Sequence, residues 1–392
     1  MTSVVALAIL NEQVTERSLS ICVRIWTDFV SRTGPTKEDT MFLRRLTLTV
    51  AAAVAVAGTS VAGIPVASAT DSGEQQAAVT ETRTIRYQVN SVTDAPDSAP
   101  GDGRCRADNG GCTLRAAVME ANATSGSTIV IPAGRYTLSI PPRGVPFTDY
   151  TLADAAHGNL KVMAPTTIVG AGLDSTVIDG GRIDRVFTVR RPATISGLTV
   201  TGGVATPLAG AESYSAGGGV LNTSELTMER VRVTGNTAGF GGGVFNTPTS
   251  SFILRDSLVD LNEAGEAGGI RFDSDGLVER ATITRNRVVN PHDPTRPGEL
   301  AGLGGGIDVR GPGITVVGSR VTDNYAEDGG GGINITLAYV PGPEVPVGPG
   351  RVELQDSVVT GNTRAGGPSD CRAVLARIVD LGGNTDSDGS CT

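Results

Sequence analysis

The chain has 392 residues, of which 53 are glycine and only 4% are aromatic. Its 41 acidic side chains outnumber its 32 basic ones, and this excess of negative charge disfavours binding to nucleic acid or to an anionic membrane. Glycine occurs without a G-x-y period and beside abundant Val, Ile and Thr, which argues against collagen and disorder and indicates many short strands joined by tight turns.

A secretory signal is indicated at residues 41–69. Arg44 and Arg45 form a basic region, residues 46–64 form an apolar run, and an A-x-A site ends at Ala69. We expect cleavage after Ala69, export, and no membrane span in the mature protein. A retained transmembrane anchor is the alternative, because the apolar run is barely long enough to cross a bilayer.

The segments on either side of this signal differ in character. Residues 1–40 precede a complete signal, so we interpret them as a start-site artefact that is absent from the mature protein. Residues 70–100 are rich in Thr, Ser, Asp and Ala and show no apolar period, which predicts a flexible leader with a first strand near residues 82–89. The folded domain is expected at residues 101–392.

Four cysteines remain once Cys22 is removed with the N-terminal segment, and an even count in an exported chain predicts two disulfides. One pair precedes the repeats and the other follows them. A disulfide needs Cα atoms within about 7 Å, so we expect Cys105 to bind Cys112 and Cys371 to bind Cys391. Zinc is the alternative, and the lack of C-x-x-C spacing and of nearby histidines disfavours it.

A short amphipathic helix is predicted directly after Cys112. Thr113 is suited to the N-cap position, and apolar residues follow at helical spacing. A helix here could cover the open end of a repeat structure, so we assign residues 105–125 to an N-terminal cap and residues 371–391 to a disulfide-closed C-terminal end. The helical positions are Leu114, Ala117, Val118 and Ala121.

The remainder of the chain repeats a phrase of two or three glycines, a β-branched residue and, about fifteen residues later, hydrophobic-x-x-Asn. Glycine pairs ending at Gly219, Gly243 and Gly269 are 24 and 26 residues apart, and Gly306 and Gly332 are again 26 apart. Such a period is typical of a solenoid. Equivalent strands would stack in parallel about 4.8 Å apart. We therefore predict an all-β, right-handed parallel β-helix.

The asparagine that ends each phrase is expected to form a ladder at one corner of the coil. Asparagine tolerates the left-handed conformation that such corners need, and its amide can bond to its neighbour in the next coil. Glycan binding is the alternative role. The ladder residues are Asn236, Asn262, Asn286, Asn324 and Asn362.

Residues 112–122, with the sequence CTLRAAVMEAN, resemble the CSLREA-type N-terminal motif of exported bacterial β-helix proteins, and residues 129–138 and 168–172 continue the resemblance. The repeats are similar to those of polymorphic outer-membrane and adhesin-like proteins in the pectin-lyase-like superfamily. The resemblance covers residues 105–392 and implies fold and export. It implies no single activity, because that superfamily includes lyases, hydrolases, epimerases, tailspikes and non-catalytic surface proteins. Many adhesin-like relatives end in a translocator or sorting signal, which residues up to 392 lack, so we expect release into the medium.

Two outward-facing columns offer candidate chemistry. If residues 270 and 307 begin adjacent coils, Arg271 lies over Asp308 and Asp273 lies over Arg310. A uronide lyase needs an arginine or lysine to abstract a proton and carboxylates to hold calcium. The competing interpretation is structural, because opposite charges stacked one coil apart neutralise each other and keep strands in register.

Two further motifs are weaker. Asn384-Thr385-Asp386 resembles the first acidic motif of polygalacturonases, but the chain has no Gly-His-Gly element, so we treat the match as coincidence. Segments 273–276 and 386–389, both Asp-Ser-Asp-Gly, resemble fragments of calcium loops and lack the distal bidentate carboxylate. We expect ordinary turns and no cofactor there, with calcium as the alternative.

Two functions are compatible with these features. The first is a secreted, monomeric and non-catalytic β-helix protein that binds an extracellular polysaccharide or another surface partner. The second is a polysaccharide-active enzyme, most plausibly a calcium-dependent uronide lyase with an arginine base. The first is favoured because the sequence shows charge pairs without a converging acid–base cluster, and the low aromatic content leaves few stacking platforms for sugars.

Overall fold

A computed structural model describes residues 85–143, 155–205, 215–289, 303–336 and 350–391. The chain divides into two units, Met1–Val79 and Thr80–Thr392, and the described residues belong to the second. The predicted artefact, the predicted signal and residues 70–84 of the predicted leader lie outside the described residues. No helix among the described residues is long and apolar enough to cross a membrane.

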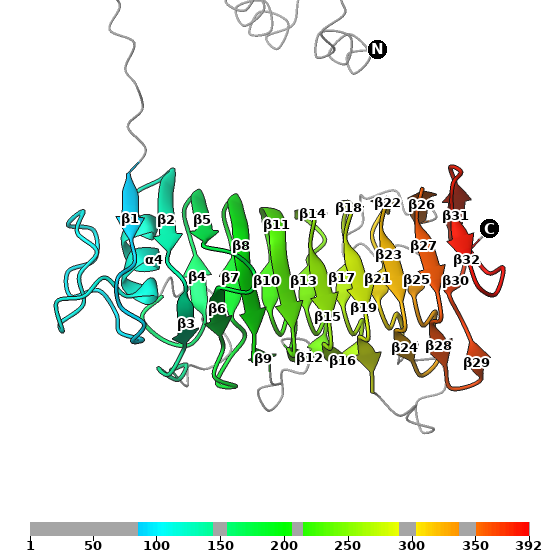
Figure 1. Ribbon diagram of the computed structural model, residues 1–392, viewed down its shortest axis with the longest axis horizontal. Helices are drawn as coiled ribbons and strands as arrows, with labels where there is room; N and C mark the ends of the chain where they lie inside the picture. Colours follow the sequence, from blue (N-terminus) through cyan, green and yellow to red (C-terminus); the bar gives the residue numbers. More distant parts are fainter. Residues whose placement is uncertain (1–84, 144–154, 206–214, 290–302, 337–349, 392) are drawn as a thin grey trace, which may run out of the picture. The chain divides into compact units, whose positions relative to one another are not determined.

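Successive coils of the chain stack to form a parallel β-helix (Figure 1). Strands of neighbouring coils pair in parallel, with the β-branched residue after each glycine phrase opposite its equivalent in the next coil, as Val244 is opposite Ile270. Parallel strands joined in this way take the right-handed form, so the predicted right-handed parallel β-helix is confirmed.

The largest sheet has 17 strands and covers two faces of the coil. One face contains β1 (Arg86–Gln88), β2 (Ser127–Ile131), β5 (Thr166–Gly170), β8 (Ala193–Thr201), β11 (Glu225–Thr234), β14 (Ser251–Arg255), β18 (Gly276–Glu279), β22 (Gly313–Val317), β26 (Arg351–Gln355) and β31 (Arg377–Asp380). The second face contains the later halves of β8 and β11 with β3 (Gly134–Thr137), β6 (Thr176–Asp179), β15 (Leu258–Asp260), β19 (Thr282–Thr284), β23 (Arg320–Thr322), β27 (Val358–Thr360) and β32 (Thr385–Asp386).

Two smaller sheets close the coil. The eight-stranded sheet follows the glycine phrases and contains β4 (Leu160–Val162), β7 (Phe187–Val189), β10 (Val220–Asn222), β13 (Val244–Asn246), β17 (Ile270–Phe272), β21 (Ile307–Val309), β25 (Ile333–Ile335) and β30 (Cys371–Ala373). The seven-stranded sheet precedes the glycines and contains β9 (Val204–Ala205), β12 (Thr237–Phe240), β16 (Glu263–Glu266), β20 (Arg287–Val288), β24 (Tyr325–Ala326), β28 (Thr363–Arg364) and β29 (Gly367–Pro368), the last of which pairs antiparallel with β28.

The core lies inside the coil and consists of stacked columns of like side chains. Alternate residues of each strand point inward, so a residue and its register partner bury against each other from coil to coil. One such column follows the glycine phrases, and every member is 0% exposed. It contains Val220, Val244, Ile270, Ile307 and Ile333.

The asparagines form a continuous buried ladder. The Asn262 side-chain amide donates to Asn286 Oδ1 at 3.0 Å and to the Val233 carbonyl at 2.9 Å, and the Asn262 backbone N–H donates to the same Asn286 oxygen. The left-handed residue, however, is the one before each asparagine, such as Leu261 (φ 56°) and Arg285 (φ 54°). The sequence-based expectation placed this conformation on the asparagines, whose amides must instead point inward to bond with the adjacent coils.

The predicted capping helix is confirmed as α4 (Leu114–Ala123), which lies beside β1 and β2 at the first coils (Figure 1). Its N-cap is Thr113, whose Oγ1 accepts the Ala116 N–H at 3.0 Å. Polar residues of the helix then hold the surrounding segments. Glu120 accepts the Gly101 and Gly103 N–H groups at 2.7 and 3.0 Å.

The two predicted disulfides are confirmed. Cys105 binds Cys112 with a Cα–Cα distance of 5.0 Å, and Cys371 binds Cys391 with a Cα–Cα distance of 5.1 Å. The first lies just before α4 and the second joins the start of β30 to the end of the described chain. Each bond therefore fixes the segment that terminates one end of the stack of coils.

Candidate functional site

The four charged candidates from the sequence lie together on the outer side of the eight-stranded sheet. Arg271 on β17 is directly opposite Asp308 on β21, as expected from the repeat. Asp273 and Arg310 follow two residues later in their own coils. The columns predicted from the glycine phrases therefore bring all four side chains to one place.

Their ion pairs differ from the expected crossed pattern. Arg271 Nε contacts Asp273 Oδ1 at 2.8 Å, and Arg310 Nε contacts Asp308 Oδ2 at 3.1 Å, so each arginine pairs within its own coil. The contact between coils comes from Glu266, whose Oε2 lies 2.9 Å from Arg271 Nη1 and 2.5 Å from Arg310 Nη2. A third carboxylate that enters from the preceding sheet draws both guanidiniums toward itself.

Glu266 was not among the sequence-based candidates. It lies at the end of β16, in the position directly opposite Phe240 of β12, and a sharp glycine turn separates it from β17. Aligning only the residues after the glycines could not identify it. The residue two positions before each glycine pair, Phe240 or Glu266, is the signal that would have done so, because that position also projects toward the outer face beside the turn.

Two charged side chains of the cluster are buried. Asp308 is 0% exposed and accepts the Asn334 side-chain amide at 2.7 Å, and Arg271 is 9% exposed. The Arg271 guanidinium carbon lies 5.1 Å from the ring centroid of Phe240 and 5.2 Å from that of Phe245. Two aromatic rings and two carboxylates thus occupy the surroundings of this guanidinium.

The electrostatics follow from three carboxylates that share two guanidiniums. Burial raises the pKa of Glu266 above its ordinary value of 4.5, and the positive charges of Arg310 and Arg271 offset only part of that effect. Burial would lower the pKa of Arg271, but Asp273, Asp308 and Glu266 together raise it above its ordinary value. Arg271 therefore remains protonated.

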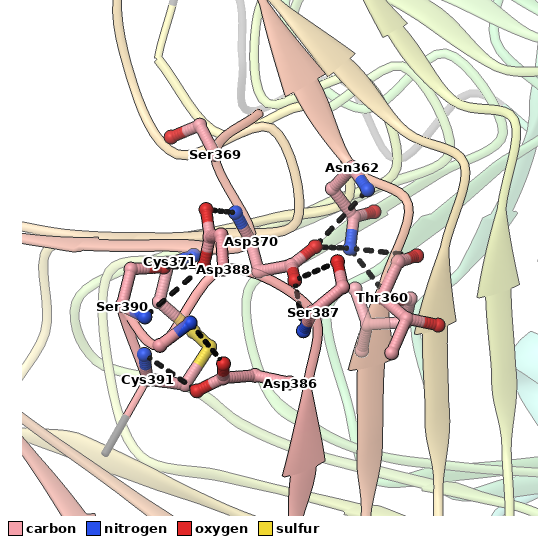
Figure 2. Close-up of a disulfide and its surroundings, with 12 residues drawn as sticks. Thr360, Asn362, Ser369, Asp370, Cys371, Asp386, Ser387, Asp388, Ser390 and Cys391 are labelled. Carbon is pink, nitrogen blue, oxygen red and sulfur yellow. Dashed lines mark hydrogen bonds between the residues drawn. A yellow bond between two sulfur atoms is a disulfide. The ribbon is translucent and has the colours of Figure 1, made fainter. Parts of the chain in front are cut away.

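A second group of acidic residues lies at the C-terminal end of the coil (Figure 2). Asp370, Asp386 and Asp388 each offer an oxygen within 4.8 Å of the others, and such a group could hold a metal ion. Asp370 also ends the asparagine ladder, because its Oδ1 accepts the Asn362 backbone N–H at 3.0 Å and side-chain amide at 2.9 Å. Its Oδ2 accepts the Ser387 N–H and hydroxyl at 2.7 and 2.6 Å.

The other two carboxylates are bound in the same way. Asp388 accepts the Ser390 N–H at 3.0 Å and the Asp370 N–H at 2.9 Å, and Asp386 accepts the N–H groups of Gly389 and Cys391. Although burial opposes it, hydrogen bonding lowers the pKa of Asp388. Calcium takes six to eight oxygen ligands. All six carboxylate oxygens here already accept hydrogen bonds, so a calcium ion would have to share oxygens that the turns and the end of the ladder use.

Comparisons with known proteins give no family assignment. No family model matches the chain, and no curated protein matches it, so the resemblance of residues 112–122 to the CSLREA motif stays a prediction. Solved structures similar to this chain include the following two. One is the A-module of mannuronan C-5 epimerase AlgE4 from Azotobacter vinelandii, at 14% identity and TM-score 0.35, covering 70% of this chain and 83% of that one. The other is pectate lyase Pel9A, at 16% identity and TM-score 0.33, covering 79% and 82%. At these values neither an activity nor a site residue transfers to this chain.

Proposed function

We propose that this protein is a secreted, non-catalytic β-helix that acts as a monomer and binds an extracellular polysaccharide or another surface partner. The observation that carries the proposal is that Arg271 and Arg310 both form ion pairs with carboxylates of this protein. Both guanidiniums are held by carboxylates on two sides, in contacts of 2.5 to 3.1 Å. The charges on this face therefore serve the register of the coils.

The alternative, a calcium-dependent uronide lyase, requires an arginine that can accept a proton from the substrate. Arg271 has a raised pKa, is almost fully buried and lies 5.1 and 5.2 Å from the centroids of two aromatic rings. Arg310 has a side chain that is 21% exposed, but Asp308 and Glu266 bind it. Neither guanidinium is available as a base, which favours binding over elimination.

Export is supported by the two disulfides, because such bonds form and persist in oxidising compartments. The predicted signal at residues 41–69 would direct it. N-terminal sequencing of the secreted protein tests this part of the proposal: we expect a first residue at Thr70, and a sequence that begins near Met1 would contradict it.

The activity test uses the secreted protein and a panel of polyuronates, with and without calcium. We expect no rise in the ultraviolet absorbance of unsaturated uronide products, and slower migration of the folded protein in native gels that contain a polysaccharide it binds. A calcium-dependent absorbance rise that is abolished in a folded Arg271→Ala variant would overturn the non-catalytic proposal. Heat-unfolded protein is the control for both measurements.

A further inference from the structure

A groove lies on the outer face of the 17-stranded sheet, on a different sheet from the strands that carry the charged cluster. It has a volume of about 320 Å³ and follows the starts of β5, β8, β11 and β14. This volume lies within the range of pockets that bind small ligands. Its floor is a single column in which consecutive coils place Thr167, Thr194, Thr227 and Ile253 directly opposite one another.

The rim of the groove comes from the corners that precede these strands. Pro165 and Pro192 lie at two successive corners, where the Thr166 N–H donates to the Pro192 carbonyl at 3.2 Å. Glu225, the exposed first residue of β11, lines the groove at the next coil. The rim thus combines two apolar rings with a carboxylate.

The polar groups of the floor are not used by the protein. Within the part of the chain that the structure describes, the hydroxyls of Thr167, Thr194 and Thr227 make no hydrogen bond and Glu225 makes no ion pair. Threonines nearby behave differently. The Thr166 hydroxyl donates to the Ala164 carbonyl at 2.8 Å, and Thr315, farther along the same column, bonds to Glu353.

Charged residues on the adjoining coils of this sheet also bind one another. Arg255 contacts Glu279 at 2.8 Å, and Arg280 contacts Asp256 at 2.7 Å. Those contacts neutralise the surface beside the groove. Glu225 is the one charged residue among those that line it. Unbonded hydroxyls, apolar rings and a single carboxylate are therefore what the groove presents to a ligand.

This chemistry fits a sugar chain. A threonine hydroxyl can donate and accept, as the hydroxyls of a sugar do. The threonines recur at the coil rise of about 4.8 Å, which is comparable with the length of one pyranose residue. Pro165, Pro192 and Ile253 can pack against the C–H faces of the rings. Glu225 accepts hydrogen bonds from sugar hydroxyls and repels an anionic sugar.

Resting on the proposed carbohydrate-binding function, we infer that this groove binds a neutral polysaccharide segment that lies along the coil axis with one pyranose ring per coil. The ligand class follows from the lining, in which a carboxylate is present and a guanidinium is not. Uronates, which the charged cluster brought into consideration, are disfavoured here by like-charge repulsion.

The test measures binding of the full secreted protein to neutral hexaoses by calorimetry, with β-1,4-linked glucose, β-1,4-linked mannose and α-1,4-linked glucose as the three probes and a galacturonate hexamer as the charged comparison. The double variant Thr194→Val with Thr227→Val keeps the β-branched shape and removes two hydroxyls. We expect at least one neutral hexaose to bind and the double variant to bind it about tenfold more weakly, since two hydrogen bonds are lost. Glu225→Gln should weaken it by a smaller factor.

Thr234→Val is the matched control, because Thr234 is on the same strand, β11, but faces away from the groove on the second face of the coil. It should bind as the wild type does. If the double variant binds the hexaose with the same affinity as the wild type, the inference that this groove binds sugar is wrong, and the proposed carbohydrate-binding function still stands. Binding of the galacturonate hexamer and of no neutral hexaose would likewise contradict the inference about the groove and leave the proposed function standing. If folded protein binds none of the four sugars, the groove inference is wrong and the proposed function narrows to a non-carbohydrate partner.

Discussion

Individual polar side chains hold the coils of this protein in register from inside and outside. Asn286 shows the inner case, because its amide donates to Val259 O of the preceding coil at 2.9 Å and to Asn324 Oδ1 of the next at 3.0 Å. Glu266 shows the outer case, since it joins Arg271 of its own coil to Arg310 of the next. Each such residue satisfies groups that would otherwise be buried without partners.

Glu266 should make stability depend on pH. Its raised folded-state pKa means that its contribution to stability is complete below pH 4.5, the ordinary pKa, and is lost as pH rises through the folded value. The neutral Glu266→Gln variant lacks this titration. We expect the free energy of unfolding of the wild type to fall, relative to that variant, as pH rises above 4.5.

Urea unfolding of both proteins at a series of pH values measures this difference. Glu263→Gln is the control, because Glu263 begins the same strand and its side chain is exposed. A difference between the wild type and Glu266→Gln that stays constant with pH would show that Glu266 does not titrate as inferred.

At the scale of elements, α4 closes the first coils through its polar residues. Arg115 is 0% exposed and binds both oxygens of Asp94 at 2.6 and 3.0 Å, together with the carbonyls of Ala155 and Gly158 at 2.9 and 2.8 Å. Asp94 in turn accepts the N–H groups of Ser139 and Ile140. One guanidinium therefore connects the helix to two separate segments outside the cap, one at Asp94 and one at residues 155–158.

Removing that guanidinium should be costly. Arg115→Ala leaves the Asp94 carboxylate buried without its partner, so we expect a loss of about 3–5 kcal/mol in the free energy of unfolding. The matched control is Arg135→Ala, whose ion pair with Asp179 involves a guanidinium side chain that is 60% exposed and should contribute less than about 1 kcal/mol. Chemical denaturation of both variants provides the comparison, and equal losses would contradict the assigned role of Arg115.

At the scale of the molecule, the two ends of the described stack are closed by different means. The first coils have a helix and the Cys105–Cys112 bond, whereas the last has the Cys371–Cys391 bond and the carboxylates of Asp370, Asp386 and Asp388. Asp370 ends the polar ladder by accepting the N–H groups of Asn362, and Asp386 and Asp388 bind N–H groups of the final turn and of Asp370. Closure of the C-terminal end is thus achieved by hydrogen bonding within the chain.

This closure leads to a prediction about metal. Because every oxygen of the three carboxylates already accepts a hydrogen bond, we expect the thermal unfolding midpoint of the secreted protein to be the same in EDTA and in millimolar calcium. Calorimetric scans in the two buffers check this. A midpoint that rises with calcium in the wild type, and not in Asp388→Asn, would instead establish the cluster as a calcium site.

The sequence by itself determined the coil, its period, both disulfides and the capping helix, because each depends on spacing along the chain. Equivalent residues after each glycine phrase fall into register even where the spacing is longer than 24 or 26 residues, which is why Arg271 was correctly expected opposite Asp308. Only the tertiary structure decided which charges meet. Glu266 reaches the arginines around a turn. Whether a threonine hydroxyl in the column of the groove floor is hydrogen-bonded depends on the side chain beside it in the next coil, as Thr315 bonds to Glu353. Partner choice among side chains depends on distances across the fold, which a one-dimensional repeat does not specify.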